Sequence, residues 1–175
     1  MKQIKFQGKY LTVTTEEKTI GGKRICFETA SLPPSVHVIP LFENGDILLI
    51  DEKKGSDNQR KLRVMAGVQE KEDPTPLEAA KREAREELGI LRGDWEHFHT
   101  TTLQGIIQDS RVYYVIRNFT LNTPTPHEGE EIYGSKRVAL SSLIPDILDG
   151  KWGASPTPLI LLMLAKDLNL LKTQK

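Results

Sequence analysis

The first third of the chain mixes polar residues with short runs of β-branched and aromatic residues, and this pattern predicts β-strands. Two such runs cover residues 9–16 and 24–32. The Gly21-Gly22 pair between them is typical of a tight turn, because glycine accepts the backbone angles that such turns require. The two runs are therefore expected to form an antiparallel hairpin.

A second pair of strands is predicted at residues 36–42 and 47–51. The Asn44-Gly45 step between them is a strong hairpin signal, so these two strands are also expected to pair. The run 48–50 is apolar without interruption, and a strand of that kind is usually buried on both faces. Such a strand needs cover, and helices later in the chain can supply it.

Helix signals are clearest between residues 75 and 89. Thr75 suits an N-cap, Pro76 suits the first helical position, and Glu78 completes a capping box. Gly89 suits the position just after the helix. The rest of the chain predicts strands at 95–102, 112–120 and 132–140, a short helix at 142–148 and a last helix from Thr157-Pro158 to about 171. Strands interleaved with helices in this way indicate an α+β fold, with a mixed sheet and helices packed over its faces.

On a helical wheel, residues 77–88 separate into an apolar stripe and an acidic stripe. The apolar stripe should face the core and contains Leu77, Ala80, Ala84 and Leu88. The acidic stripe beside it contains Glu83, Glu86 and Glu87. Their spacing places like charges on adjacent turns, where they repel one another. A hard divalent cation such as Mg²⁺ would compensate this repulsion, a solvated acidic face is the alternative, and spacing alone leaves both open.

Composition and charge narrow the classes of function. The chain has 175 residues, which is typical of one domain, and its 24 basic and 24 acidic residues give a net charge of zero. A protein that neutralises a long polyanion needs a basic excess, so nucleic-acid binding is not expected. Cys26 is the single cysteine, which excludes an internal disulfide and suits a reducing compartment. No run is apolar enough for a signal peptide or a membrane span, so a cytoplasmic location is expected.

The segment 67–90, GVQEKEDPTPLEAAKREAREELGI, resembles the Nudix box, G-x5-E-x7-R-E-U-x-E-E-x-G-U, in which U is aliphatic. Its second half matches at Arg82, Glu83, Glu86, Glu87, Gly89 and Ile90, with Ala84 as a small U. The first half departs from the pattern, because Gly67 lies one residue further from Arg82 and Pro74 stands at the acidic position. Either Glu72 or Asp73 fills that acidic role if the loop carries a one-residue insertion.

The resemblance extends over nearly the whole chain and is strongest to the ADP-ribose pyrophosphatase branch of the Nudix hydrolases. The chain departs from that branch where Lys54 replaces a common Arg and where residues 101–110 replace a loop that contains S-P-G. The similar features are the antiparallel strands FQGKYLTV and GGKRICFETASLP, the strand pair VHVIPLF and DILLIDE, the step Met65-Ala66-Gly67, the acidic loop at 128–132 and Gly150-Lys151 before the last helix.

This resemblance implies the Nudix fold, in which a mixed sheet lies between helices as an α/β/α sandwich with N-terminal antiparallel strands, all in one domain over residues 1–175. It also implies Mg²⁺-dependent hydrolysis of the pyrophosphate bond of a nucleoside diphosphate derivative, with Mn²⁺ as an alternative ion. The substrate implied first is ADP-ribose, which would give AMP and ribose 5-phosphate. The metal ligands would be the Ala66 carbonyl and the side chains of Glu83, Glu86 and Glu87.

Further roles follow from the same resemblance. Arg82 would orient the glutamates, with an ordinary surface ion pair as the alternative. Glu128 would be the general base with Glu130 assisting, because a metal-bound helix carboxylate loses basicity, and a solvated acidic loop is the alternative. Lys54 and Asp109 would contact the substrate, and the alternatives are an exposed loop and a turn-capping Asp. No role is assigned to His37, His97, His99 or His127.

In the resembled branch, N-terminal strands reach across a two-fold axis, so residues 1–34 are expected to help form a homodimer. The other partner is a small nucleotide substrate, and neither nucleic acid nor a membrane is expected. Two alternatives stay open. One is a diphosphatase for another nucleotide sugar or a dinucleotide, and the other is a non-catalytic Nudix domain that senses a nucleotide.

Overall fold

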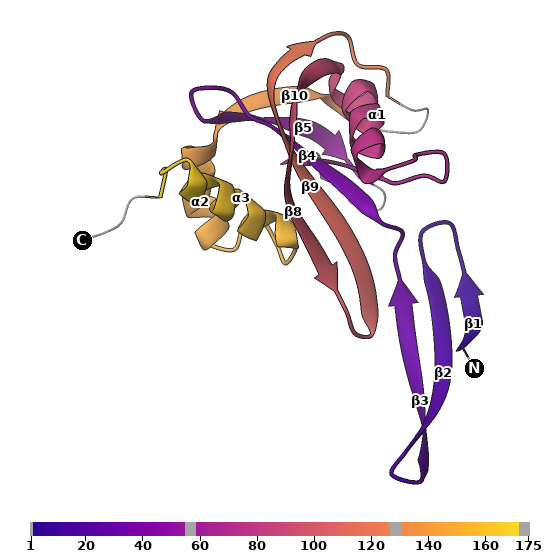
Figure 1. The fold of residues 1–175 in the computed structure, drawn as a ribbon. Helices are drawn as coiled ribbons and strands as arrows, with labels where there is room; N and C mark the ends of the chain where they lie inside the picture. Colours follow the sequence, from indigo (N-terminus) through magenta and orange to yellow (C-terminus); the bar gives the residue numbers. More distant parts are fainter. Residues whose placement is uncertain (1, 55–58, 127–130, 172–175) are drawn as a thin grey trace.

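The computed structural model describes residues 2–54, 59–126 and 131–171 (Figure 1). In chain order its strands and helices are β1 (Lys2–Gln7), β2 (Thr12–Ile20), β3 (Lys23–Ser31), β4 (Ser35–Pro40), β5 (Asp46–Lys53), β6 (Lys61–Arg63), β7 (Met65–Val68), α1 (Pro76–Leu88), β8 (Ile90–Leu103), β9 (Ile107–Leu121), β10 (Glu131–Ala139), α2 (Leu140–Leu148) and α3 (Pro156–Asp167). None of the helices in these residues has the length and hydrophobicity that a membrane crossing requires.

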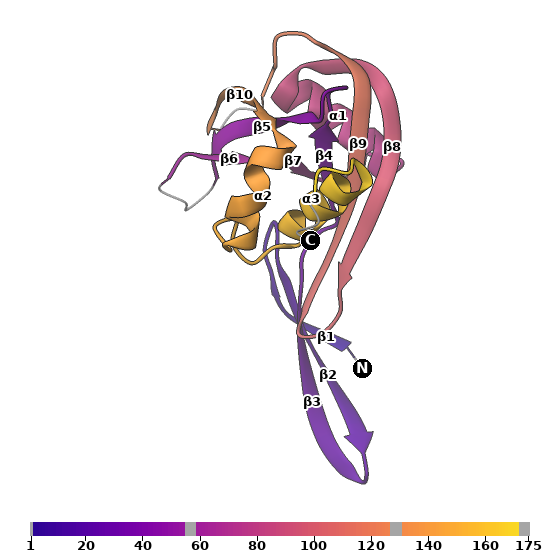
Figure 2. The ribbon, with the colours of Figure 1, turned by 90° about the vertical axis from the view of Figure 1, so that its left-hand side faces the viewer.

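The central strands lie between α1 on one face and α2 with α3 on the other (Figures 1 and 2). Successive residues of a strand point to opposite faces, and the core divides accordingly. Ile39 and Tyr113 pack with α2 and α3, whereas their neighbours Val38 and Tyr114 pack with α1. The α+β fold class and its helix–sheet–helix layers are therefore confirmed.

The layer of strands is built from two sheets. One runs in the order β1-β2-β3-β9-β4-β7, with β8 also paired to β9, and the other runs β10-β5-β6. The first sheet is mixed, because β4 runs parallel to β9 and antiparallel to β7. Strand β7 belongs to the first sheet and β5 to the second. Both strands contribute residues to the candidate site described below.

The predicted hairpin between 36–42 and 47–51 is wrong in its pairing. The turn at Gly45 forms, but the strands separate after one isolated bridge between Leu41 and Ile47. The reason is that β9 and β7 occupy both edges of β4, so β5 pairs with β10 and β6 instead. The burial of residues 48–50 on both faces is confirmed, since all three are buried and they alternate between the two cores.

The predicted helices form close to their expected limits. In α1 the Thr75 hydroxyl accepts a hydrogen bond from the backbone N–H of Glu78 at 3.2 Å, and Gly89 ends the helix with a φ of 68°. The Glu78 carboxylate accepts from Lys81 Nζ at 2.8 Å, so it serves an ion pair along the helix. Helix α3 ends at Asp167, earlier than expected, because Asn169 adopts a left-handed φ of 56°.

Strands β1–β3, here called the N-terminal arm, extend away from the rest of the chain (Figures 1 and 2). The predicted hairpin of β2 and β3 is confirmed, and it is joined to β9 by the pairs Ala30–Ile107 and Ser31–Gln108. The arm exposes large apolar side chains at Ile4, Phe6, Tyr10, Leu11, Ile20, Ile25 and Phe27. Apolar side chains in such number are expected to be covered by another surface.

Candidate active site

Helix α1 packs closely against β7 at Gly67. Glu83 and Glu87 are charged yet buried, at 6% and 4% exposed, because the helix lies directly against the sheet. At Gly67, an added Cβ would lie 2.0 Å from the Glu83 carboxyl carbon, far inside contact distance. The Glu83 carboxylate can therefore occupy this position only because Gly67 has no side chain.

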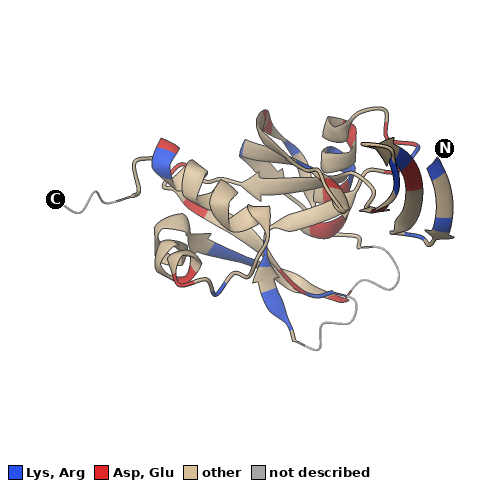
Figure 3. Cartoon of the chain, turned by 90° about the horizontal axis from the view of Figure 1, so that it is seen from below, with Lys and Arg blue, Asp and Glu red and all other residues tan. Residues whose placement is uncertain are grey.

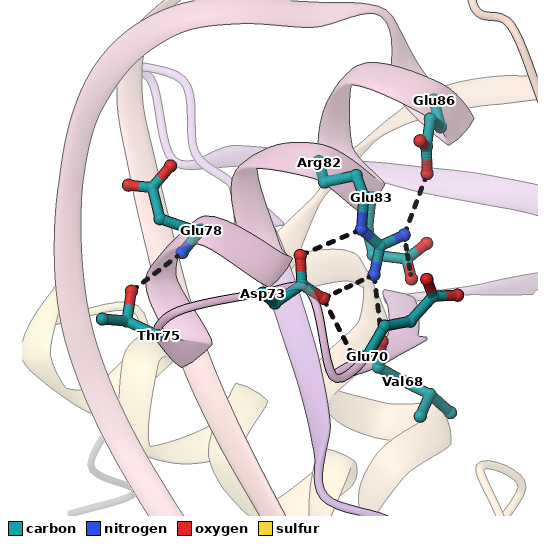
Figure 4. Close-up of polar contacts among 8 residues, drawn as sticks. All are labelled: Val68, Glu70, Asp73, Thr75, Glu78, Arg82, Glu83 and Glu86. Atoms are coloured by element: carbon teal, nitrogen blue, oxygen red, sulfur yellow. Dashed lines mark hydrogen bonds and ion pairs between the residues drawn. The ribbon is translucent and has the colours of Figure 1, made fainter.

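Arg82 holds two of the glutamates of α1 (Figure 4). Its Nη1 donates hydrogen bonds to Glu83 Oε1 at 3.0 Å and to Glu86 Oε2 at 3.1 Å. Two carboxylates thus converge on one nitrogen, which offsets the repulsion expected from their spacing. This contact is more than the ordinary i,i+4 ion pair, since a single guanidinium is shared by both acids.

The Arg82 guanidinium also donates hydrogen bonds to residues that precede α1 (Figure 4). Nε and Nη2 donate to the two oxygens of Asp73 at 3.1 and 2.9 Å, and Nη2 also donates to the Val68 carbonyl at 3.1 Å. Hydrogen bonding to Arg82 lowers the pKa of Asp73 below its usual range, and Asp73 raises the pKa of Arg82. Of the two acids that the loop offers for this position, Asp73 makes the contact, while Glu72 is exposed.

Lys54 lies at the Ala66 carbonyl. Its Nζ donates to that oxygen at 2.9 Å and lies 3.4 Å from Glu52 Oε1. A cation therefore contacts the backbone oxygen that the sequence resemblance assigns to a metal. Glu52 is buried at 3% exposed, and sequence reasoning missed it, although the acidic pair Asp51-Glu52 after the apolar run 48–50 was a usable signal.

The donors around α1 suit a hard divalent cation, because they are carboxylate and carbonyl oxygens. Within the described parts of the chain, no group of three or more His, Cys, Asp or Glu residues is placed so that it could hold a metal ion. Glu83 and Glu86 are turned toward Arg82 here, and the proposed loop acids Glu128 and Glu130 lie outside the described residues. The chemistry of the donor set fits Mg²⁺, while Glu83 and Glu86 are arranged around the Arg82 guanidinium.

A cavity of about 810 Å³ opens beside this cluster, on the face of the sheet that α2 and α3 cover. We call it the cationic cavity. It is lined by residues of strands β4, β5, β6, β7 and β9, of helices α2 and α3 and of the segment between these helices. Its walls include His37, Glu52, Lys54, Ala66, Arg111 and Trp152. A volume of this size is typical of small-molecule sites, which hold roughly 300–1,000 Å³.

His37 is a buried histidine in the wall of this cavity, at 7% exposed. Its ring stacks on Tyr113 with 4.5 Å between centroids, and Nε2 lies 3.4 Å from the Ser35 hydroxyl. Burial lowers the pKa of His37 to about 3, with further lowering from the charges of Arg111 and Lys54. The imidazole is therefore neutral at physiological pH, a property that the sequence did not indicate.

Asp109 lies within β9, not in a loop before the strand as expected. Its Oδ2 accepts a hydrogen bond from Arg111 Nε at 2.6 Å, and Arg111 lines the cationic cavity. Of the two residues expected to contact substrate, Lys54 reaches the cavity directly and Asp109 acts on it through Arg111.

Comparisons with known proteins identify a family and a similar fold. A family model described as NUDIX domain matches residues 31–158. Among solved structures, one titled "Crystal structure of ADP compounds hydrolase" is similar over 98% of this chain and 95% of its own, with a TM-score of 0.76 and 17% identity. No curated protein sequence matches the chain.

Proposed function

Because this chain belongs to the NUDIX domain family, we propose that it hydrolyses the pyrophosphate bond of a nucleoside diphosphate derivative with the help of Mg²⁺. The observation that carries the proposal is the pair of buried glutamates, Glu83 and Glu87, on a helix that packs against β7, the strand whose residue Ala66 lines a cavity of about 810 Å³. ADP-ribose, giving AMP and ribose 5-phosphate, is the first substrate to test, and the fold shared with a protein titled as an ADP compounds hydrolase supports that choice.

The Ala66 carbonyl and the carboxylates of Glu83, Glu86 and Glu87 would hold the metal. When bound, Mg²⁺ or Mn²⁺ neutralises charge on the phosphate oxygens and makes a bound water a better nucleophile. Arg82 orients Glu83 and Glu86 from behind, because it is itself fixed by Asp73.

The general base in this proposal is Glu128, with Glu130 assisting. The chain on either side of these residues supports the assignment. Before them, the backbone N–H of Thr125 donates to the Glu86 carbonyl at 2.9 Å, and after them Glu131 pairs with Lys53 on β5. Thr125 thus lies next to Glu86 of α1, and Glu131 lies beside β5, the strand that carries Glu52.

The chemical step is a substitution at phosphorus. A water oxygen forms a bond to one phosphorus, the bond from that phosphorus to the bridging oxygen breaks, and the bridging oxygen leaves on the second phosphate. The loop carboxylate accepts the proton that the water loses. The products are two monophosphates.

We propose further that residues 1–175 form one domain that works as a homodimer through the N-terminal arm, in a reducing compartment such as the cytoplasm. The arm exposes Phe6, Ile25 and Phe27, and β1 is an edge strand, so a second copy can cover apolar surface and pair with an open edge. Light scattering during size-exclusion chromatography should give twice the chain mass, and a monomer at micromolar concentration would contradict the dimer.

The deciding experiment is a substrate panel. Purified chain is incubated with Mg²⁺ and ADP-ribose, ADP-glucose, GDP-mannose, diadenosine polyphosphates or deoxynucleoside triphosphates, and monophosphate release is measured with and without EDTA. We expect metal-dependent release of AMP from ADP-ribose. Turnover of a different compound would favour another nucleotide sugar or a dinucleotide. Tight nucleotide binding with no turnover of any compound would contradict the enzyme and favour a sensing domain.

A further inference from the structure

His37 has a ring nitrogen without a hydrogen-bond partner in the part of the chain that the structure describes. The residue lies on β4, in the wall of the cationic cavity, and only 7% of its surface is exposed. Nε2 lies 3.4 Å from the Ser35 hydroxyl, whereas Nδ1 is buried and has no such contact. A buried polar atom without a partner destabilises a fold. Because the ring forms part of a cavity wall, a bound ligand can supply the partner.

The imidazole ring is held in place by the strands on either side of it. His37 is opposite Tyr113 of β9 and opposite Ala66 of β7 in the sheet register. Its ring stacks on the Tyr113 ring, which is itself fully buried. Ala66 lines the same cavity. A ring held in this way keeps Nδ1 at a defined place, as selective recognition of a ligand group requires.

The same part of the wall offers uncharged polar groups. The Tyr113 hydroxyl lies 3.2 Å from Thr157 Oγ1, so Thr157 and His37 contact one tyrosine side chain. Residues 152–165, which lead into and form most of α3, contain no Lys, Arg, Asp or Glu (Figure 3). Three residues of this segment line the cavity, namely Trp152, Ser155 and Thr157. A few well-placed neutral groups of this kind set the specificity of small-molecule sites.

A hydroxyl group of a ligand matches Nδ1 better than a phosphate oxygen does. A neutral imidazole has one N–H and one bare nitrogen, and a hydroxyl pairs with either because it both donates and accepts. An ionised phosphate oxygen only accepts, and Lys54 and Arg111 in the same wall are stronger partners for it. Sugars carry several hydroxyls on an uncharged ring, so a sugar suits this part of the wall.

The proposed function brings a sugar close to His37. In that proposal the substrate diphosphate lies at the metal site, which includes the Ala66 carbonyl. Neighbouring strands are about 4.8 Å apart, and His37 lies directly opposite Ala66 in the next strand. The sugar joined to the diphosphate is therefore the part of the substrate within reach of His37.

We propose that His37 determines substrate specificity, through a hydrogen bond between its Nδ1 and a hydroxyl of a sugar next to the diphosphate. The proposal rests on the proposed function and makes its substrate class narrower, since a compound that lacks this hydroxyl leaves Nδ1 unpaired in the complex. A site built to hydrogen-bond a hydroxyl rejects the analogue without it for this reason. ADP-ribose carries a ribose on each side of its diphosphate, and both present such hydroxyls.

Monodeoxy analogues of ADP-ribose, each lacking one hydroxyl of one ribose, test the hydrogen bond. The ratio kcat/KM is measured for ADP-ribose and for each analogue. We expect one analogue to fall about tenfold below ADP-ribose, the effect of leaving one buried polar atom unpaired. The position of the missing hydroxyl shows whether the nucleoside ribose or the distal ribose contacts His37. If every analogue equals ADP-ribose, the proposal is wrong.

Variants of His37 assign this preference to the ring nitrogen. His37→Phe keeps a ring that stacks on Tyr113 and removes both nitrogens, so the preference for ADP-ribose over the sensitive analogue should disappear. His37→Asn places an amide close to the position of Nδ1 and should keep a preference of about threefold. His97→Phe is the matched control, because His97 is exposed on β8 and does not line the cavity. A preference that survives His37→Phe, or that disappears equally in His97→Phe, would overturn the proposal.

Nuclear magnetic resonance on the wild-type chain separates this proposal from the proposed function. The chain is labelled at its histidine nitrogens, the signals of His37 are assigned by their loss in His37→Phe or His37→Asn, and ADP-ribose is added to saturation in EDTA. We expect the Nδ1 signal of His37 to shift while the signals of His97 stay in place. This shift without turnover in Mg²⁺ would support His37 as a binding residue and refute the hydrolase. An unchanged Nδ1 signal in the saturated complex would refute the role of His37 even if ADP-ribose is hydrolysed.

Discussion

The two faces of the chain at β7 carry opposite charge. On the α1 face, Glu83, Glu86 and Glu87 crowd together and Arg82 offsets two of them. On the other face, basic side chains surround a cavity and a few acids offset them. The first face offers carboxylate oxygens, the ligands that a hard divalent cation prefers, whereas the second is lined mainly by basic and apolar groups. The difference shows how one strand, β7, can separate an acidic helix from a largely basic cavity.

The faces also differ in how they are assembled. The acidic face is built within one helix, where spacing of three and four residues suffices to bring the carboxylates together. The basic residues of the other face come from the position after β5, from β6 and β9 and from the segment after α2, and they lie as far apart in the sequence as Lys54 and Lys151. Substitutions on the acidic face should therefore act on catalysis itself, and those on the cationic face on selectivity and stability.

The largest expected effect is on the acidic face. Glu87→Gln keeps the shape of the side chain and removes its charge, so turnover should fall by about 10²–10³-fold while the fold is retained. Initial rates and the melting temperature measure the two quantities. Glu78→Gln on the exposed side of the same helix is the control and should keep turnover close to that of the wild type. Near-normal turnover of Glu87→Gln would refute the metal assignment.

Gly67→Ala tests whether the position of the Glu83 carboxylate matters for the reaction. The new Cβ would lie 2.0 Å from the Glu83 carboxyl carbon, so the carboxylate must move. A displacement of this size at a reacting centre costs about 10²-fold in rate. Gly105→Ala, where an added Cβ meets no atom within 4 Å, serves as the control. If Gly67→Ala retained full activity, the position of Glu83 would not matter for the reaction.

Arg82→Lys tests whether the hydrogen bonds of Arg82 orient the Glu83 and Glu86 carboxylates for metal binding. Lysine retains the charge but cannot contact Asp73, Glu83 and Glu86 through one planar fork. The Mg²⁺ concentration for half-maximal activity should rise by about tenfold, as expected when a residue that orients metal ligands is altered. It is read from a metal titration of the rate. An unchanged requirement for metal would reduce Arg82 to an ordinary ion pair.

The smallest expected effect concerns His37 and is a decrease in the free energy of unfolding at acidic pH. Because burial lowers the pKa of His37 to about 3, the native state binds fewer protons than the unfolded state below the ordinary histidine pKa of about 6.5. The unfolded state therefore gains as the pH falls between these values, and the free energy of unfolding drops. At pH 5.5 this one residue should cost about 1.4 kcal/mol relative to pH 8.

Urea unfolding of the wild type and of His37→Gln at both pH values measures that difference. The variant should lose less stability on acidification than the wild type, and the exposed His97→Gln should behave as the wild type does. The same pH dependence in all three proteins would show that His37 is not held neutral.

Much of the fold followed from local pattern. The caps at Thr75 and Gly89 limit α1 as expected, and the apolar run 48–50 is buried on both faces. The pairing of β4 did not follow, because the Asn44-Gly45 turn signal describes a local bend and carries no information about β9, which competes for the same strand edge from more than sixty residues away along the chain.

The sequence by itself determined the acidic helix, its core stripe and the resemblance of the box, since all of these depend on residues that lie close together along the chain. Only the tertiary structure decided that Asp73 holds Arg82, that Lys54 reaches the Ala66 carbonyl, and that Arg111 and Lys151 share one cavity. The physical reason is that helical spacing is set by the geometry of the backbone, whereas contacts between distant segments depend on which strand edges pair and which faces the helices cover.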